Sequence, residues 1–336
     1  MIKKQTDRMG ENEVSIRGRI LREIIAHFHS DQMTEQDIMG GGIRKRLEEA
    51  PWKSPEGYEV LPVSMENFEM ELLQSEEDKG ELVVLQLHGG GYVGKLRNSH
   101  RATAVLYSRA GKGCNVLTID YRVAPEHPYP AALEDGLAAY YWLLEQGYTG
   151  DKILLGGDSA GGGLAMAMTM YLRDHGQEMP KGIVAMSPWT DLTASGTSYD
   201  DNFEIDPLFG KTRESLIYNN AYPGEEDPEN PYISPMFGSF EDFPPMLVQV
   251  GTHEMLLSDS ITVVKKARQA GVKVRFGRYE GMFHVFQRAM LLLPESRKAW
   301  IEVERFIEKI NEPVTDQNTK RALPAKDGAI ASPHPE

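Results

Sequence analysis

The sequence predicts an α/β fold with a mostly parallel central sheet, because apolar segments alternate with helical patterns along most of the chain. The 336 residues are 40 % hydrophobic and 26 % charged, which is typical of a globular protein with a sizeable core. Apolar strands separated by helices indicate a parallel sheet covered on both faces. We expect strands at 82–87, 114–119, 152–155, 182–186, 246–250 and 272–276, and helices at 99–110, 130–146, 160–174, 258–270 and 291–311.

The ends of the chain and one internal segment depart from this alternation. Ile16, Ile20, Ile24, Ile25 and Phe28 recur at helical spacing, which predicts an amphipathic helix near the N-terminus. A second helical segment before Pro51 and two strands, at 59–62 and 68–73, are expected to follow. Residues 195–243 are rich in Asp, Asn, Gly and Pro and are expected to form an insertion over one end of the sheet. Residues 313–336 show no periodicity and are expected to be disordered.

Composition excludes several classes of function. The formal net charge is −14, and a chain this acidic repels phosphate backbones, so no nucleic-acid partner is expected. No apolar run approaches the roughly 20 residues that span a bilayer, and no apolar segment of a secretory signal follows the N-terminus. The single cysteine, Cys114, excludes an intrachain disulfide and fits a reducing compartment. We expect a cytoplasmic protein.

A serine turn is the strongest chemical signal. Residues 157–161 read GDSAG, which matches G-x-S-x-G between an expected strand and an expected helix. Small neighbours let the Ser159 hydroxyl stand exposed at a sharp turn, and the following helix directs free N–H groups toward the site. Ser159 is therefore the candidate nucleophile, and the N–H of Ala160 is a candidate donor to an oxyanion.

A glycine loop follows the strand at 82–87. Residues 88–91 read HGGG, and glycines allow backbone N–H groups to approach a ligand closely. Together with the downstream serine motif, this loop is interpreted as an oxyanion loop. Gly90 and Gly91 are the expected donors, with Gly89 in support.

The base and the acid are expected on loops near the C-terminal end of the sheet. His284, among nine histidines, lies in a glycine-bearing loop after the last strand and completes the order Ser, acid, His. Two carboxylates compete for the acid, because Glu254 and Asp259 both follow the strand at 246–250. Glu254 is favoured since it comes first off the strand, whereas Asp259 is expected to cap the next helix.

These motifs resemble the hormone-sensitive-lipase family of α/β-hydrolases, the bacterial esterases with a GDSAG motif. Residues 120–132 (DYRVAPEHPYPAA), 187–189 (SPW) and 281–286 (GMFHVF) are similar to further segments of that family. The resemblance covers about 80–312 and implies an α/β-hydrolase fold with a helical cap, no metal and no organic cofactor. It implies N-terminal cap helices at 1–50, core at 51–194 and 226–312, and a cap insertion at 195–225. The 30-residue separation of Glu254 and His284 resembles the family's spacing, although the family commonly has Asp-Pro-Leu at the acid.

The resulting expectation is a serine carboxylesterase that hydrolyses short-chain acyl esters of small molecules. A deacetylase of sugars or drug-like esters, or an amidase, stays open, as does a non-catalytic ligand receptor on the same fold and a homodimer. The residues expected to line the substrate pocket are Phe203, Ile205, Leu208, Phe209 and Tyr218.

Overall fold

Eight strands form one sheet in the computed structural model, which describes residues 14–29, 49–76 and 81–312. Its spatial order is β1-β2-β4-β3-β5-β6-β7-β8. Strand β1 pairs antiparallel with β2, β2 pairs antiparallel with β4, and all other neighbours are parallel. The strands are β1 (Tyr58–Ser64), β2 (Glu69–Ser75), β3 (Val83–Leu87), β4 (Asn115–Asp120), β5 (Ile153–Asp158), β6 (Gly182–Met186), β7 (Met246–Gly251) and β8 (Val274–Tyr279).

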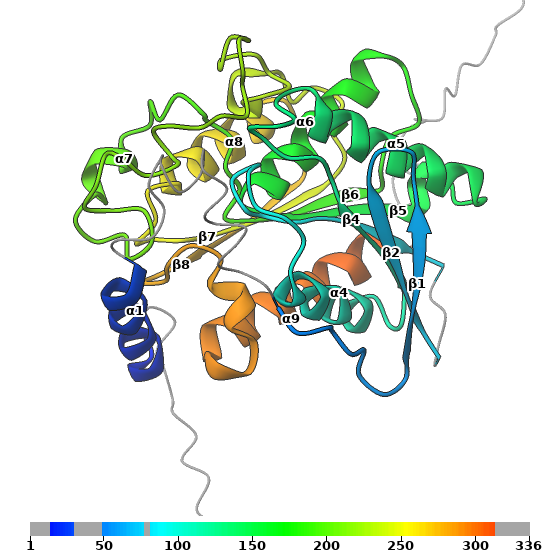
Figure 1. Ribbon diagram of the computed structural model, residues 1–336, viewed down its shortest axis with the longest axis horizontal. Helices are drawn as coiled ribbons and strands as arrows, with labels where there is room; N and C mark the ends of the chain where they lie inside the picture. Colours follow the sequence, from blue (N-terminus) through cyan, green and yellow to red (C-terminus); the bar gives the residue numbers. More distant parts are fainter. Residues whose placement is uncertain (1–13, 30–48, 77–80, 313–336) are drawn as a thin grey trace, which may run out of the picture.

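Helices cover both faces of this sheet. Side chains of α5, α6 and α8 share one apolar cluster with Val83 and Leu85, whereas α4 and α9 share another with Val84. This alternation within β3 is what burial on both faces requires. Figure 1 shows the two helical layers on opposite sides of the sheet. The helices are α1 (Ile16–His29), α4 (Asn98–Ala110), α5 (Ala131–Glu145), α6 (Ala160–Asp174), α7 (Ser198–Asp201), α8 (Leu257–Gln269) and α9 (Pro294–Asn311), with short 3₁₀ helices η1 (Gly150–Lys152), η2 (Pro235–Phe237) and η3 (Phe286–Leu292).

The predicted α/β architecture is confirmed, with one change near the C-terminal end of the fold. The expected helix over 291–311 starts later, at Pro294, and the 3₁₀ helix η3 precedes it. Proline fits the first turn of a helix but disrupts an interior position, so the α-helix begins there. The second helical segment expected before Pro51 and the tail expected at 313–336 lie outside the described residues.

The insertion at 195–243 is built mainly from turns rather than helices. The helices among its described residues are the four-residue α7 and the 3₁₀ helix η2. Side-chain oxygens of Asp206, Asn220, Asp227 and Asn230 accept hydrogen bonds from backbone N–H groups two residues further on. Such local bonds favour turns over helix.

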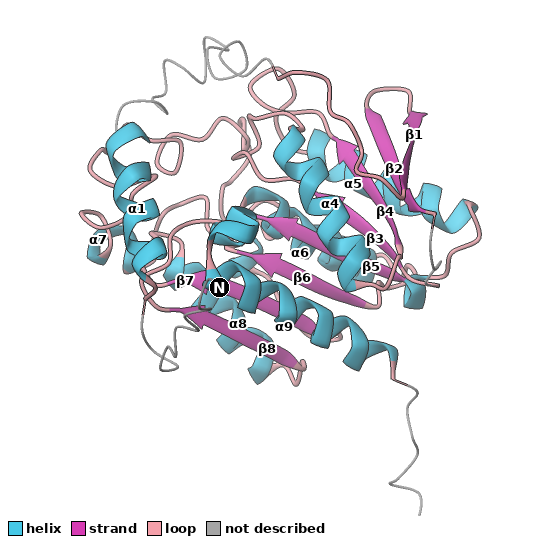
Figure 2. Ribbon diagram, turned by 90° about the horizontal axis from the view of Figure 1, so that it is seen from below, coloured by secondary structure: helices cyan, strands magenta, loops and turns pink. Residues whose placement is uncertain are grey.

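Helix α1 lies at the side of the sheet opposite to β1 and β2 (Figures 1 and 2). The single cysteine, Cys114, is fully buried between α4 and the sheet, and burial raises the pKa of its thiol to about 12. None of the helices in the described part of the chain has the length and apolar composition that a bilayer crossing requires.

Candidate active site

The serine turn between β5 and α6 holds its central residue in an unusual backbone conformation. Ser159 has φ 55° and ψ −123°, a region that costs backbone energy for a residue with a side chain. The neighbouring chain leaves no room for larger residues. A Cβ atom on Gly157 would lie 2.2 Å from the carbonyl oxygen of Gly161, and one on Gly161 would lie 2.0 Å from that of Leu87. The glycines of the motif therefore permit the close packing that makes the turn.

Ser159, His284 and Glu254 form one hydrogen-bonded row. The Ser159 hydroxyl lies 2.9 Å from Nε2 of His284, and Nδ1 of His284 lies 2.9 Å from Oε2 of Glu254. With its proton on Nδ1 donated to Glu254, the imidazole accepts a hydrogen bond from the serine hydroxyl through Nε2. Ser159 and His284 are each 7 % exposed, and Glu254 is fully buried.

The Glu254 carboxylate is held by two further donors. The N–H of Gly251 lies 2.5 Å from Oε1, and the hydroxyl of Ser187 donates to the same oxygen at 2.8 Å. Ser187 also accepts a hydrogen bond from the N–H of Val285 at 3.1 Å, so it connects the loop after β6 to the residue that follows His284. Sequence reasoning singled out the SPW segment but assigned Ser187 no function. The sequence feature that could have indicated a role for Ser187 is its position directly after the strand β6.

The competing carboxylate, Asp259, is directed elsewhere. Its Oδ2 accepts hydrogen bonds from the N–H groups of Thr190 and Asp191 at 2.9 and 3.0 Å. The residue before α8 is Leu256 and no side chain caps this helix, so the expected capping role of Asp259 is wrong. Burial and the nearby Asp191 raise the pKa of the Asp259 carboxyl well above its usual range. Asp259 fixes the loop after β6 to α8.

The glycine loop after β3 lies beside the serine turn. The N–H of Gly89 donates to Oδ1 of Asp158 at 3.2 Å, which ties the loop to the residue before the serine. Gly90 and Gly91 have φ 131° and 63°, values that favour glycine. Among the residues that the structure describes, none accepts a hydrogen bond from the N–H of Gly90, Gly91 or Ala160. Gly89 thus lacks a free N–H, whereas the other three expected donors have one.

Two buried histidines stiffen the start of this loop and the neighbouring helix α4. The His88 ring stacks on Tyr121 with centroids 4.1 Å apart, and desolvation lowers its pKa. Nδ1 of His100 accepts a hydrogen bond from the N–H of Arg97 at 2.9 Å. Desolvation and the positive charge of Arg288 hold the pKa of His100 well below its usual range. Both side chains are therefore neutral structural groups at neutral pH.

A cavity of about 470 Å³ opens onto Ser159 and His284. Two of the expected pocket residues, Leu208 and Phe209, line it, and the Phe209 ring packs edge-on against His284 with centroids 4.9 Å apart. The other three expected pocket residues do not line this cavity. Arg213 lies over the rings of Phe203 and Tyr218, and Ile205 is 44 % exposed. The abundance of aromatic residues in the insertion does not predict which of their rings line the cavity.

Sequence reasoning missed several residues of the cavity wall. Leu216 lies directly over the glycine loop, because a Cβ atom on Gly91 would be 2.8 Å from its side chain. Leu21 and Ile25 of α1 also line the cavity. Ile25 belongs to the apolar pattern that predicted the N-terminal helix and Leu21 does not. That pattern does not show which neighbour the helix covers.

Two polar residues of the insertion clamp the loop that carries Glu254. Asn202 donates through Nδ2 to the carbonyl oxygens of Thr252 and Glu254 at 3.0 and 2.7 Å. Asp206 accepts hydrogen bonds from the N–H of Met255 at 2.8 Å and from that of Phe209 at 3.0 Å. The insertion is therefore anchored to the loop that carries Glu254.

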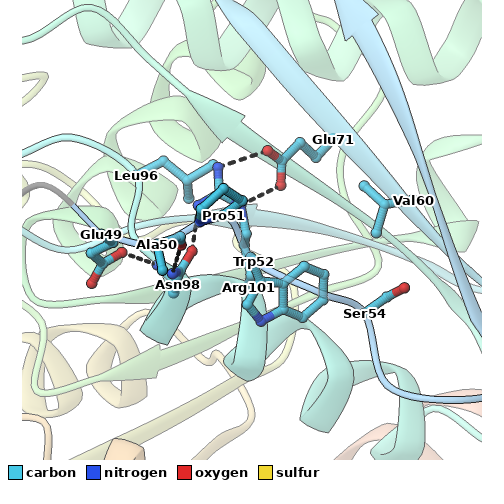
Figure 3. A pocket seen from close by; sticks show the side chains of 10 residues that line it. All are labelled: Glu49, Ala50, Pro51, Trp52, Ser54, Val60, Glu71, Leu96, Asn98 and Arg101. Atoms are coloured by element: carbon cyan, nitrogen blue, oxygen red, sulfur yellow. Dashed lines mark hydrogen bonds and ion pairs between the residues drawn. The ribbon is translucent and has the colours of Figure 1, made fainter.

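A second hollow, of about 540 Å³, lies between α4 and the edge strands. Figure 3 shows that its polar side chains face one another. Arg101 makes two hydrogen bonds of 2.7 Å to Glu71, and the N–H of Asn98 donates to Glu49 at 2.6 Å. These polar groups already have partners, so the hollow offers little to a ligand. In ranges 14–29, 49–76 and 81–312, no cluster of His, Cys, Asp or Glu is arranged to hold a metal ion.

Comparisons with known proteins define the class. A family model described as alpha/beta hydrolase fold matches residues 84–288. An acetyl-hydrolase of Streptomyces hygroscopicus is 40 % identical over 220 residues, which cover 66 % of this chain and 73 % of the relative. The crystal structure of an esterase from the bacterial hormone-sensitive lipase family superposes with a TM-score of 0.77 and 34 % identity, covering 88 % of this chain and 99 % of that one. The crystal structure of EstE5 soaked with p-nitrophenyl butyrate superposes with a TM-score of 0.78 and 34 % identity, covering 88 % of this chain and 99 % of that one.

The chain belongs to the α/β-hydrolase family. Within this family it is a carboxylic ester hydrolase of the hormone-sensitive lipase type. The fold class and the family resemblance predicted from the sequence are both confirmed.

Proposed function

We propose that this ester hydrolase works through a Ser159–His284–Glu254 triad and an oxyanion hole formed by the N–H groups of Gly90, Gly91 and Ala160. The observation that carries the proposal is the hydrogen-bonded row of 2.9 and 2.9 Å contacts, which ends in a carboxylate fixed by two donors. Nucleophile, base and orienting acid in this geometry are what serine acyl transfer requires.

In the proposed mechanism Ser159 attacks the ester carbonyl while His284 accepts its proton. The carbonyl oxygen becomes an oxyanion, and the unpaired N–H groups of Gly90, Gly91 and Ala160 donate to it. His284 then protonates the leaving alcohol. Water, deprotonated by the same histidine, attacks the acyl-serine and releases the acid. The Glu254 carboxylate offsets the positive charge that forms on the imidazole.

The substrates we propose are small esters with short acyl chains, from acetate to about hexanoate. A cavity of about 470 Å³ suits a small ligand, and Leu216 and Phe209 close over the glycine loop and His284. The 40 % identical relative is named an acetyl-hydrolase, which favours acetate esters as one group of substrates. Turnover of p-nitrophenyl esters from acetate to palmitate tests this proposal. Equal turnover of palmitate and butyrate would contradict it.

Replacing the proposed nucleophile tests the mechanism directly. Ser159→Ala should lower kcat on p-nitrophenyl butyrate by up to about a million-fold, since loss of a triad nucleophile leaves only binding and oxyanion effects. The matched control is Ser195→Ala, a serine whose hydroxyl donates to Asp191 away from His284, and it should retain turnover. A folded Ser159→Ala enzyme with substantial activity would overturn the assignment.

A further inference from the structure

Helix α1 is fixed on the body of the enzyme by its inner face. Leu21 and Ile25 line the active-site cavity and pack beside the cluster around Met282. The N–H and hydroxyl of Ser15 both donate to Glu295, at 2.7 and 3.0 Å, and Arg22 donates to the carbonyl of Gly281 at 3.1 Å. The helix is thus a fixed part of the cavity wall.

The outer face of the same helix is apolar and open to solvent. Ile16, Ile20 and Ile24 are 75 %, 55 % and 47 % exposed. Residues four apart lie on the same side of a helix, so the three form one continuous stripe. None of them belongs to the apolar clusters formed by the described residues. Single exposed apolar residues are ordinary, but a contiguous stripe of isoleucines marks an interaction surface.

The charge of this helix is opposite to that of the protein. Residues 14–29 contain Arg17, Arg19 and Arg22 against a single acid, Glu23, and so carry a formal charge of +2. The rest of the chain therefore carries −16. Arg17 and Arg19 are exposed and flank the buried Gly18, and Glu23, one turn after Arg19, is exposed as well. A basic, amphipathic helix with an exposed apolar stripe has the composition of helices that lie in a membrane interface.

We propose that the outer face of α1, defined by Ile16, Ile20, Ile24, Arg17 and Arg19, docks onto an anionic lipid surface. The isoleucines would enter the boundary between headgroups and acyl chains, and the arginines would contact anionic headgroups. A second copy of the chain fits this face less well. A two-fold contact would bring the arginines of one copy toward those of the other.

Docking in this way places the substrate cavity at the surface. Leu292 is 63 % exposed and lines the cavity together with Leu21 and Ile25 of the docking helix. Esters held in or on a lipid layer would therefore reach the cavity without crossing bulk water. This surface proposal does not depend on the proposed triad, because binding can be measured without turnover.

The test is co-sedimentation of the full chain, carrying Ser159→Ala to prevent hydrolysis, with vesicles of phosphatidylcholine alone or mixed with phosphatidylglycerol. We expect binding to the anionic vesicles only, weakened at high salt. I16Q/I20Q/I24Q should reduce the partition coefficient at least tenfold. R17Q/R19Q should reduce it about 25-fold, since each arginine near an anionic surface contributes about fivefold.

Matched controls replace residues of similar exposure on other helices. Ile261 and Ile301, on α8 and α9, are 42 % and 43 % exposed, and I261Q/I301Q should bind vesicles like the parent. R305Q should do the same, as Arg305 lies exposed on α9. Melting temperatures show whether each variant is folded. The salt and lipid dependence of vesicle binding is measured on the parent protein, so it does not rely on the folding of any variant.

The outcomes distinguish an anionic lipid surface from a second copy of the chain as the partner of the outer face of α1. Anionic-selective, salt-sensitive binding that only the α1 variants lose supports the proposal. Equal binding to both vesicle types, or no binding to either, overturns it. Light scattering that shows a dimer dissociated by I16Q/I20Q/I24Q, without vesicle binding, also overturns it and assigns the face to a second copy.

Discussion

The two sides of the active-site cavity contact it through different kinds of groups. The floor consists of the loops after β3, β5, β6, β7 and β8, where buried polar atoms are joined by hydrogen bonds such as Ser187 to Glu254. Its residues with positive φ include Ser159, Ser187 and Val285. The roof consists of α1 and residues 208–217, which contact the cavity through apolar side chains such as Leu21 and Leu216.

This difference predicts two kinds of mutational effect. Hydrogen bonds fix the position of the floor atoms, and chemistry is sensitive to their displacement. Apolar contacts fix only the volume and shape of the roof, and these decide which ester fits. Changes in the floor should therefore lower kcat for every ester, whereas changes in the roof should alter the ranking of esters.

The largest effect is expected for the acid of the floor. Glu254→Gln keeps the shape of the side chain but removes the charge that holds His284 in its working tautomer, so kcat should fall by up to roughly ten-thousand-fold. Turnover of p-nitrophenyl butyrate and a melting curve measure this. Asp259→Asn is the matched control, because its carboxylate contacts Thr190 and Asp191 instead of His284. It should lower the melting temperature and leave most of the activity. The reverse result would reassign the acid.

A smaller effect is expected for the hydroxyl that supports this acid. Ser187→Ala removes a hydrogen bond to a charged group, worth about 1.5–3 kcal/mol, so kcat should fall roughly ten- to hundred-fold while KM changes little. Ser234→Ala is the control, since its buried hydroxyl accepts a hydrogen bond from the N–H of Leu192, away from Glu254. If both variants lose stability but neither loses kcat, Ser187 has no positioning role.

In the roof, Leu216→Ala should change selectivity more than rate. Removing three carbons above Gly91 enlarges the cavity, and a methylene in such a pocket is worth about tenfold or more. We expect the ratio of kcat/KM for octanoate over acetate to rise about tenfold. Leu61→Ala, an exposed residue on β1, should leave the ratio unchanged. A uniform loss of kcat/KM for all chain lengths would show that Leu216 affects the rate, as floor residues are expected to do, and not the selectivity.

The smallest effect concerns pH and stability at the edge of the floor. The pKa of His100 is lowered in the folded state, so between that value and about 6.5 the unfolded chain binds the extra proton. Stability should therefore decrease as the pH falls below about 6.5, by up to ~1.4 kcal/mol per pH unit for one group. His100→Asn keeps an acceptor for the N–H of Arg97 and should flatten this slope. His127→Asn, at an exposed position, should not. An unchanged slope in His100→Asn would show that this histidine titrates normally.

The floor residues could be located from the sequence because each of them lies in a loop that follows a strand. The serine turn, the glycine loop and His284 each follow a recognisable apolar strand, and parallel strands bring such loops to one edge. The choice between Glu254 and Asp259 rested on distance from the strand end, and the geometry places Glu254 beside His284.

The roof was less predictable because its positions depend on tertiary contacts. Phe203, Phe209 and Tyr218 are similar aromatic residues in one insertion, yet only Phe209 reaches the cavity while Arg213 holds the other two. The hydrogen bonds of Asn202 and Asp206 to the loop at 252–255 join segments about fifty residues apart. No local pattern encodes such pairings.

The burial of Cys114 gives this protein a practical advantage for spectroscopy. It is the only cysteine in the chain, it is fully buried, and the pKa of its thiol is about 12. Thiol-specific dyes react with thiolates that solvent can reach, so they should not label Cys114. One cysteine introduced at Ile20, on the outer face of α1, would then carry a single fluorophore without replacement of Cys114.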